Sequence, residues 1–196
     1  MTKLLFIIPA LITVAFAGAA FSQDAGQSPL QTVPSVDLQR YSGRWYEIAR
    51  YPNKFQKQCV GNTTATYTVK EKGRIEVLNE CLTKDGTVDT AKGEAKIVEN
   101  ANNAKLKVRF APAFLSAFGF VWGDYWVIDL GPGYEYSVVG DPKREYLWIL
   151  SRTPELPEPT YQAILRRVQD FGFNPGKLEK TPQKAEAVKG AVIEKQ

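Results

Sequence analysis

The segment from Tyr41 to Tyr51, YSGRWYEIARY, constrains the fold of this chain more than any other stretch. It places a tryptophan two residues after a glycine and then continues into a strand. Gly43 lets the backbone pass close to a bulky neighbour, and Trp45 can plug one end of a closed sheet with a large, rigid ring. We therefore expect the first strand of a β-barrel to begin here.

Side chains alternate between apolar and polar in seven further segments, which is the pattern of half-buried strands. These segments are residues 63–70, 74–82, 87–98, 105–110, 125–130, 135–140 and 145–152. The turns between them carry glycine, proline, asparagine or aspartate, which accept a positive φ or preset a bend. Short connections favour antiparallel neighbours. The sequence thus predicts an all-β fold, an eight-stranded antiparallel up-and-down barrel that encloses side chains and one small ligand.

An α-helix is expected after the barrel. Apolar residues recur there at helical spacing, with prolines before them and Gly172 after them: Tyr161, Ile164, Leu165, Val168 and Phe171. This is an amphipathic pattern with start and stop signals. We expect its apolar stripe to pack on the outer wall of the barrel.

Three segments carry a resemblance to a known family. Gly43-Arg44-Trp45-Tyr46 resembles the signature of the lipocalins, small cups that hold a hydrophobic ligand. Residues 123–142 and 146–154 resemble the sixth, seventh and eighth strands of that family, in the same order. The resemblance extends from Leu38 to Lys180 and includes bacterial outer-membrane lipocalins and apolipoprotein D. It implies that Arg152 lies against Trp45, so that Gly43, Trp45 and Arg152 form the floor of the cup.

The chain is long enough for one domain with a sizeable core, and it shows no internal repeat. Residues 1–22 are typical of a secretory signal peptide, with Lys3, an apolar stretch and a small-x-small cleavage site. A membrane helix is the alternative, although Pro9 and Gly18 interrupt the stretch. We expect a flexible leader over 23–35, the barrel and its helix over 36–180, and a loosely ordered tail over 181–196.

The signal peptide places the expected mature protein in the periplasm or outside the cell, in soluble form. Many bacterial relatives carry lipid on a cysteine at the cleavage point, and no cysteine precedes Cys59, so we expect no lipid anchor. Cysteines in an exported chain are usually paired. A Cys59–Cys81 disulfide would join the first loop to the third strand. Because the two positions are out of register, the chain near Gly61 must fold over to allow it.

The candidate pocket follows from alternation, because one inward residue fixes the facing of its strand unless a bulge intervenes. With Trp45 inward, Glu47, Ala49 and Tyr51 follow. The proposed ligand-binding side chains are mostly apolar, with a phenol and an amide to orient a ligand: Tyr67, Asn79, Val108, Phe110 and Trp148. A filled core without ligand is the alternative. Glu47 is the polar candidate, as the partner of an arginine or as the holder of a polar head group.

Residues 110–122, FAPAFLSAFGFVW, join the fifth and sixth expected strands, which in a lipocalin places them at the open mouth. An apolar connection on a soluble protein marks a contact site. Three roles are open: a lid over the ligand, a foot that enters a membrane surface, or a dimer contact. The side chains that would make these contacts are Phe114, Leu115, Phe118 and Phe120.

Composition argues against catalysis and against nucleic acid as a partner. The chain has no histidine, which excludes a serine-histidine triad and histidine-containing zinc sites. We expect no catalytic residue, metal or cofactor. The net charge of +4 is spread without a basic run, so a nucleic-acid site is not indicated.

The expected function is binding, with transport or sequestration, of a small hydrophobic ligand in the cell envelope, by a monomer or weak homodimer. A fatty acid, a lysophospholipid or a related membrane lipid is the expected ligand. Two alternatives remain open. One is a carrier of a ring-shaped hydrophobe such as a pigment, isoprenoid or haem. The other is an envelope protein that uses the 110–122 loop to contact a membrane or partner.

Overall fold

The computed structural model describes residues 28–110 and 122–183 of the chain. Three expectations fall outside these ranges. They concern the signal peptide at residues 1–22, the tail beyond residue 183, and the mouth-loop side chains of Phe114, Leu115, Phe118 and Phe120. They remain predictions.

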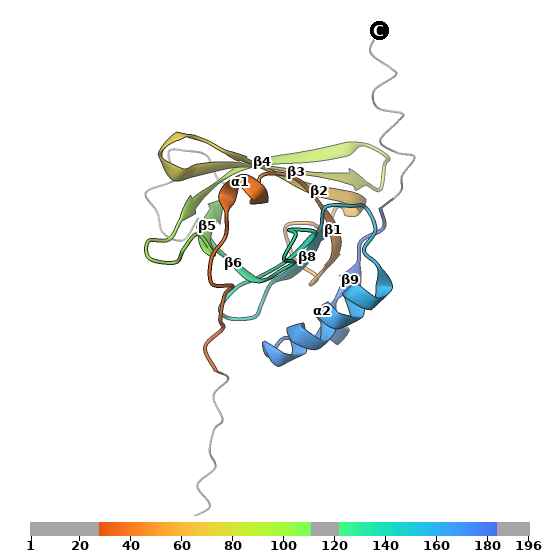
Figure 1. The fold of residues 1–196 in the computed structure, drawn as a ribbon. Coiled ribbons are helices and arrows are strands. Elements are labelled where there is room, and N and C mark those ends of the chain that lie inside the picture. The colour runs from red at the N-terminus through yellow and green to blue at the C-terminus, as the bar shows by residue number, and fades with distance from the viewer. Residues whose placement is uncertain (1–27, 111–121, 184–196) are drawn as a thin grey trace, which may run out of the picture.

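The expected barrel is confirmed. Its strands are β1 (Gly43–Arg50), β2 (Cys59–Val69), β3 (Arg74–Thr83), β4 (Val88–Ile97), β5 (Lys105–Arg109), β6 (Gly123–Leu130), β7 (Tyr136–Gly140) and β8 (Leu147–Ser151). Each strand pairs antiparallel with the next, and β1 pairs with both β2 and β8, which closes the sheet. Figure 1 looks into the resulting ring, with α2 (Glu158–Asp170) outside it. A two-residue strand, β9 (Glu179–Lys180), also pairs with β1.

Short helical elements complete the fold. Before β1, α1 (Leu38–Tyr41) is capped by Asp37, whose carboxylate accepts hydrogen bonds from two backbone N–H groups of the first turn. Two 3-10 turns, η1 (Glu71–Gly73) and η4 (Pro175–Lys177), precede β3 and β9. No helix in the described ranges is long and apolar enough to cross a membrane.

Two hydrophobic clusters lie on opposite sides of the barrel wall. The inner cluster surrounds Trp45 and includes residues from all eight strands. The outer cluster packs α2 against the wall through Tyr161, Ile164 and Val168, as the helical spacing predicts. Because α2 covers its outer face and the core fills its inner face, every residue of β7 is buried.

The expected facing of β1 is wrong beyond Glu47. A register shift against β8 between Glu47 and Ala49 marks a β-bulge. The extra residue puts Ala49 and Tyr51 in the outer cluster with α2 instead of the interior. The Tyr51 hydroxyl donates to the carbonyl of Asn174 at 2.9 Å. Alternation could not reveal this change, because a bulge resets the two-residue period.

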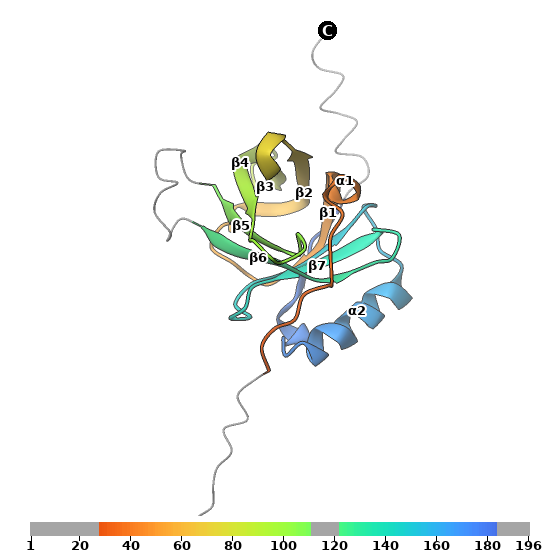
Figure 2. The same ribbon diagram turned by 60° about the vertical axis from the view of Figure 1, so that its left-hand side comes forward.

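The segment expected to be a flexible leader packs on the barrel as far as it is described. Leu30 is buried in the outer cluster, Val33 packs against the inner one, and Val36, just after this segment, is buried in the inner one. The N–H of Val33 donates to the carbonyl of Val127 at 3.0 Å, and that of Val36 to Asn102 at 3.0 Å. Figure 2 shows this segment in orange, running along the barrel to α1. Its apolar residues are too sparse to form a sequence period, so composition suggested a leader.

The Cys59–Cys81 disulfide is confirmed, and the chain near Gly61 is irregular in the way that brings the two cysteines together. Two register shifts, one on each side of Gly61, bring Cys59 opposite Thr83. Cys81 lies two residues from that partner, and the Cα atoms of the two cysteines are 5.6 Å apart. Asn62 adopts a φ of 50° at this irregularity. The disulfide therefore fixes the start of β2 to the end of β3.

Replacing both cysteines with alanine tests the structural role of this disulfide. The closed loop spans a sequence separation of 22 residues. The chain-entropy model assigns about 3 kcal/mol to a loop of that size, so we expect the free energy of unfolding to fall by about that amount. Urea unfolding measures it, with reduced wild-type protein as the matched control. Equal stabilities of the oxidised wild type and the variant would contradict the prediction.

Candidate functional site

The floor of the barrel is a tryptophan covered by an arginine. The Trp45 side chain is completely buried, and its indole N–H donates to the carbonyl of Tyr41 at 2.8 Å. The Cζ atom of Arg152 lies 3.8 Å from the centre of the Trp45 ring, a cation–π contact. The guanidinium also donates to the backbone carbonyls of Ser42 and Arg44, both at 3.0 Å, and to that of Arg40. Burial lowers the pKa of Arg152 from its usual value.

Gly43 lies at the same place, so the structure brings the three expected floor residues together. Its φ is +91°, a conformation that favours glycine, and a Cβ there would lie 3.6 Å from Nη1 of Arg152. This end of the barrel is closed by α1 and by the stacked side chains of Trp45 and Arg152. The floor is therefore sealed by side chains from the first strand, β1, and from the residue after the last strand of the barrel, β8.

A chain of hydroxyl groups lies beside the floor. The Tyr41 hydroxyl is 2.9 Å from that of Ser137 and 2.8 Å from that of Tyr125. The Tyr125 hydroxyl donates to that of Tyr67 at 2.9 Å. All four residues are buried. Burial raises the pKa of Tyr41, Tyr67 and Tyr125 above the usual value for a phenol, so the three remain protonated at neutral pH.

The expected ligand-binding residues lie at different heights in the barrel. Tyr67 is buried beside the floor within the tyrosine cluster. Asn79 on β3 is opposite Ala65 on β2, which in turn is opposite Trp45 on β1. The side chains of Asn79, Ala65, Val108 and Trp148 all keep accessible surface. Trp45 and Tyr67 are thus buried, whereas Ala65 and Asn79 beside them, and Val108 and Trp148, stay partly accessible.

Phe110 differs from the expectation of a pocket residue. It follows the last residue of β5 and is 45% exposed. Its ring lies against Gly93 of β4, where a Cβ would come within 2.6 Å of the ring. Alternation along β5 predicts which face Phe110 is on, but not how far along the barrel axis it lies. The sequence therefore could not show that Phe110 lies at the open end of the barrel.

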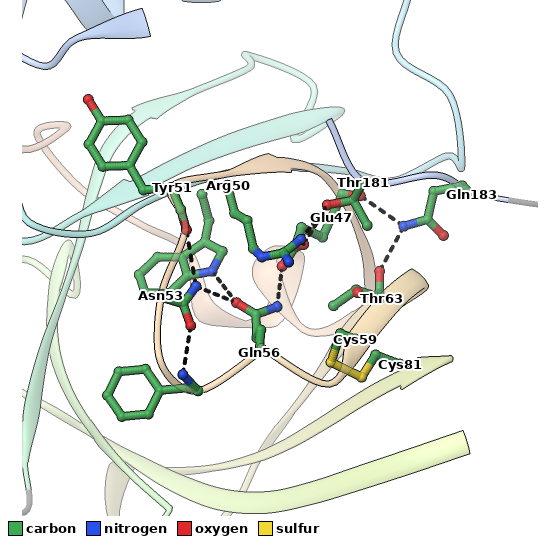
Figure 3. A network of polar contacts seen from close by, with 12 residues as sticks. Glu47, Arg50, Tyr51, Asn53, Gln56, Cys59, Thr63, Cys81, Thr181 and Gln183 are labelled. Carbon is green, nitrogen blue, oxygen red and sulfur yellow. Dashed lines mark hydrogen bonds and ion pairs between the residues drawn. A yellow bond between two sulfur atoms is a disulfide. The ribbon is translucent and has the colours of Figure 1, made fainter. Parts of the chain in front are cut away.

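Glu47 is the centre of a buried polar network, which Figure 3 shows from close by. Its side chain is 4% exposed and forms an ion pair with Arg50 at 3.2 Å. The carboxylate also accepts hydrogen bonds from Thr181 and Gln56, each at 2.6 Å. A buried carboxylate needs partners of this kind, and Glu47 has three. The interpretation of Glu47 as the partner of an arginine agrees with this geometry.

Gln56 connects this network to the loop between β1 and β2. While its amide N–H donates to Glu47, its carbonyl oxygen accepts from the Trp148 indole at 3.0 Å and from the Asn53 amide at 2.9 Å. Figure 3 shows these contacts converging on Gln56. The Trp148 ring stacks on Tyr146 with an interplanar angle of 7°. The loop is therefore held at the barrel end opposite α1 by one side chain.

The tail begins in the same network, so its first residues differ from the expected loose order. Thr181 is buried, and the Gln183 amide donates to the backbone carbonyls of Glu47 at 2.8 Å and Thr63 at 2.9 Å. Sequence reasoning missed Gln56, Thr181 and Gln183, because single polar residues in a loop or tail carry no signal of long-range contact. Tyr125 alternates with Val127, a signal that could have placed it in the interior.

Two surface pockets formed by described residues lie outside the barrel interior. One lies between Ile48, Leu156 and Tyr161, where β1 faces α2. The other lies where the segment at Val33 crosses the turn between β4 and β5. Neither contains an expected ligand-binding residue.

The sequence and the fold both match known proteins. The family model described as a lipocalin-like domain matches residues 36–183. Temperature-induced lipocalin-1 of Arabidopsis thaliana is 42% identical over 156 residues, which cover 79% of this chain and 83% of that protein. Outer membrane lipoprotein Blc of Escherichia coli K12 is 36% identical over 171 residues, covering 84% of this chain and 92% of that protein.

Among solved structures, insecticyanin from the tobacco hornworm Manduca sexta has a similar fold. The TM-score is 0.63 at 21% sequence identity, and the alignment covers 81% of this chain and 86% of that one. The likeness concerns the architecture of the barrel.

Replacing Gln56 with alanine should release the loop between β1 and β2. The change removes one donor to buried Glu47 and one acceptor for Trp148, so we expect a loss of about 2 kcal/mol in the free energy of unfolding. Hydrogen exchange of the amides of residues 51–58 should also accelerate. Gln58 is the matched control, because its side chain is exposed, and Q58A should change stability by less than about 0.5 kcal/mol. Equal effects of the two variants would contradict the role of Gln56.

The buried tyrosines predict a loss of stability at alkaline pH. The pKa of each is raised in the folded state, so their contribution is fully present below the unfolded value of about 10 and is lost as the pH rises above it. Urea unfolding between pH 9 and 11 measures the slope. Y125F removes one of these protons and should reduce the slope by up to about 1.4 kcal/mol per pH unit. An unchanged slope would show that the Tyr125 proton does not contribute.

Proposed function

Because this chain belongs to the lipocalin family, we propose that it binds a membrane lipid, such as a fatty acid or lysophospholipid, inside its barrel and carries or sequesters it. Members of this family bind small hydrophobic ligands. One observation carries the proposal: the barrel is sealed at the floor by Trp45 and Arg152, while other inward residues keep accessible surface. An apolar interior closed at one end suits a long, narrow ligand.

Burial of the ligand supplies the driving force. Each methylene that leaves water contributes about 0.8 kcal/mol, so an acyl chain can drive binding after the costs of immobilisation. Val108 and Trp148 would provide the apolar contacts. The family consists of binding and transport proteins that are generally not enzymes, and we propose a binding function here.

The cell envelope is the proposed location. The Cys59–Cys81 disulfide fits an oxidising compartment outside the cytoplasm. Blc of Escherichia coli is named an outer membrane lipoprotein. We propose a periplasmic or secreted protein that acts as a monomer or weak homodimer.

Contact with a membrane surface is a second candidate function, favoured by the outer wall of β4 to β6. There, Lys96 lies over the Trp122 ring at 4.3 Å, and Lys105 lies over the Trp126 ring at 4.0 Å. Cations beside tryptophans suit an anionic lipid surface, where charge attracts and the indole enters the interface. The apolar 110–122 segment lies between β5 and β6 in the sequence.

Two sets of substitutions separate cavity binding from surface binding. W148A should weaken binding of a C16 lysophospholipid by about tenfold, because it removes a large inward apolar side chain. V88A is the control, since Val88 is 59% exposed. The triple variant F114S/L115S/F118S should keep this affinity and lose association with anionic vesicles. Fluorescence titration and vesicle sedimentation are the measurements.

The outcomes decide between the candidates. Wild-type protein that binds no lipid would refute the proposed function. Lipid binding that neither W148A nor the triple variant changes would show that the ligand lies elsewhere. Native mass spectrometry of protein purified from its own envelope would give the mass of the bound ligand, and a ring-shaped hydrophobe in that spectrum would replace the membrane lipid in the proposal.

A further inference from the structure

The direction of the tyrosine hydrogen bonds leaves one proton unused inside the barrel. Tyr125 donates to Tyr67, and a hydroxyl has one proton, so Tyr41 must donate to Tyr125. By the same count Ser137 donates to Tyr41. The chain therefore runs from Ser137 to Tyr67. Within the described residues, the Tyr67 hydroxyl accepts one hydrogen bond and donates none.

A complementary group lies on the neighbouring strand. The Oδ1 atom of Asn79 is buried and accepts no hydrogen bond from the described residues. Asn79 pairs with Ala65, and Tyr67 follows Ala65 by two residues, so the two side chains are diagonal neighbours on one face of β2 and β3. Diagonal neighbours are within reach of each other's long side chains. One unused donor and one unused acceptor thus face the same interior.

The charges nearby disfavour an anion at this place. The carboxylate of Glu47 acts on the Tyr67 hydroxyl, where it adds to burial in raising the pKa. The Arg50 guanidinium is bonded to Glu47 and Thr181, and the Arg152 guanidinium is bonded to three carbonyls at the floor. A carboxylate here would meet the negative charge of Glu47 and the oxygen of Asn79, while Arg50 is already paired with Glu47 and Arg152 is held by carbonyls at the floor. A neutral group that both accepts and donates would satisfy both orphan atoms.

We propose that Tyr67 and Asn79 form a recognition site for a neutral hydroxyl group, so that the ligand is a lipid alcohol bound hydroxyl-first. The ligand hydroxyl accepts from Tyr67 and donates to Oδ1 of Asn79. Its apolar chain then extends past Val108 and Trp148 toward the end opposite α1. This inference rests on the proposed function and narrows its ligand class. It favours alcohols, including monoacylglycerols, over ionised fatty acids.

Three ligands with the same chain length but different hydrogen-bonding groups test the two proposed hydrogen bonds separately. 1-Hexadecanol can use both groups, its methyl ether can only accept, and hexadecanoate is an anion that cannot donate. Displacement of a fluorescent probe at pH 7.5 gives each dissociation constant. We expect hexadecanol to bind about threefold to tenfold more tightly than the ether, the usual effect of one hydrogen bond, and more tightly than hexadecanoate.

Two substitutions assign the groups. Y67F should weaken hexadecanol and the ether alike by about threefold to tenfold, whereas N79L should weaken hexadecanol alone. Y46F is the control, because Tyr46 lies on the opposite face of β1 from Trp45. Comparing ligands within one variant cancels any general effect on the fold.

The results distinguish this inference from the function on which it rests. If none of the three ligands displaces the probe, lipid binding itself fails. If all three bind but hexadecanol has no advantage, or if Y67F and N79L leave the order of affinities unchanged, the hydroxyl site is refuted while lipid binding stands. Tighter binding of hexadecanoate than of hexadecanol would also overturn it.

Discussion

The rest of the structure depends on the pairing of β1 along both of its edges. Residues Gly43–Tyr46 pair with β2, and residues from Tyr46 to Arg50 pair with β8, so this strand closes the sheet. Closure removes the free edges and forces one face of every strand into a shared interior. The same strand carries Trp45 at the floor and Glu47 in the polar network. Barrel closure, the sealed end and the anchor of the loop thus share one short segment.

The bulge between Glu47 and Ala49 lets this strand serve two cores. Before it, side chains enter the barrel, and after it Ala49 and Tyr51 pack with α2 on the outer wall. An unbroken strand would send these residues into the interior and leave α2 with a weaker contact. Asp129 on β6 supplements that contact through its ion pair with Arg167 of α2 at 2.6 Å. The position of the helix therefore depends on a local irregularity of the strand.

Much of this fold follows from the sequence, because a two-residue period and turn residues are local signals. The contact between Trp45 and Arg152 followed from the family resemblance, and the disulfide followed from cysteine count and compartment. The β1 bulge, the rim position of Phe110 and the packing of Leu30 did not follow, since each depends on register or on contacts distant in sequence. The hydroxyl chain needs Ser137, Tyr41, Tyr125 and Tyr67 from four separate elements. No local pattern links such residues.

The interior contains polar groups that stability alone does not explain. A buried donor or acceptor without a partner costs about 1 to 3 kcal/mol, and an apolar side chain at position 79 would avoid that cost. A ligand that supplies the missing partner removes the cost on binding and gains specificity from it. The hydroxyl chain also fixes the Tyr67 ring before a ligand arrives, through bonds that begin at Ser137 and Tyr41. Since the donor is already oriented, a ligand hydroxyl would not have to immobilise it, and less of the binding free energy is lost to ordering.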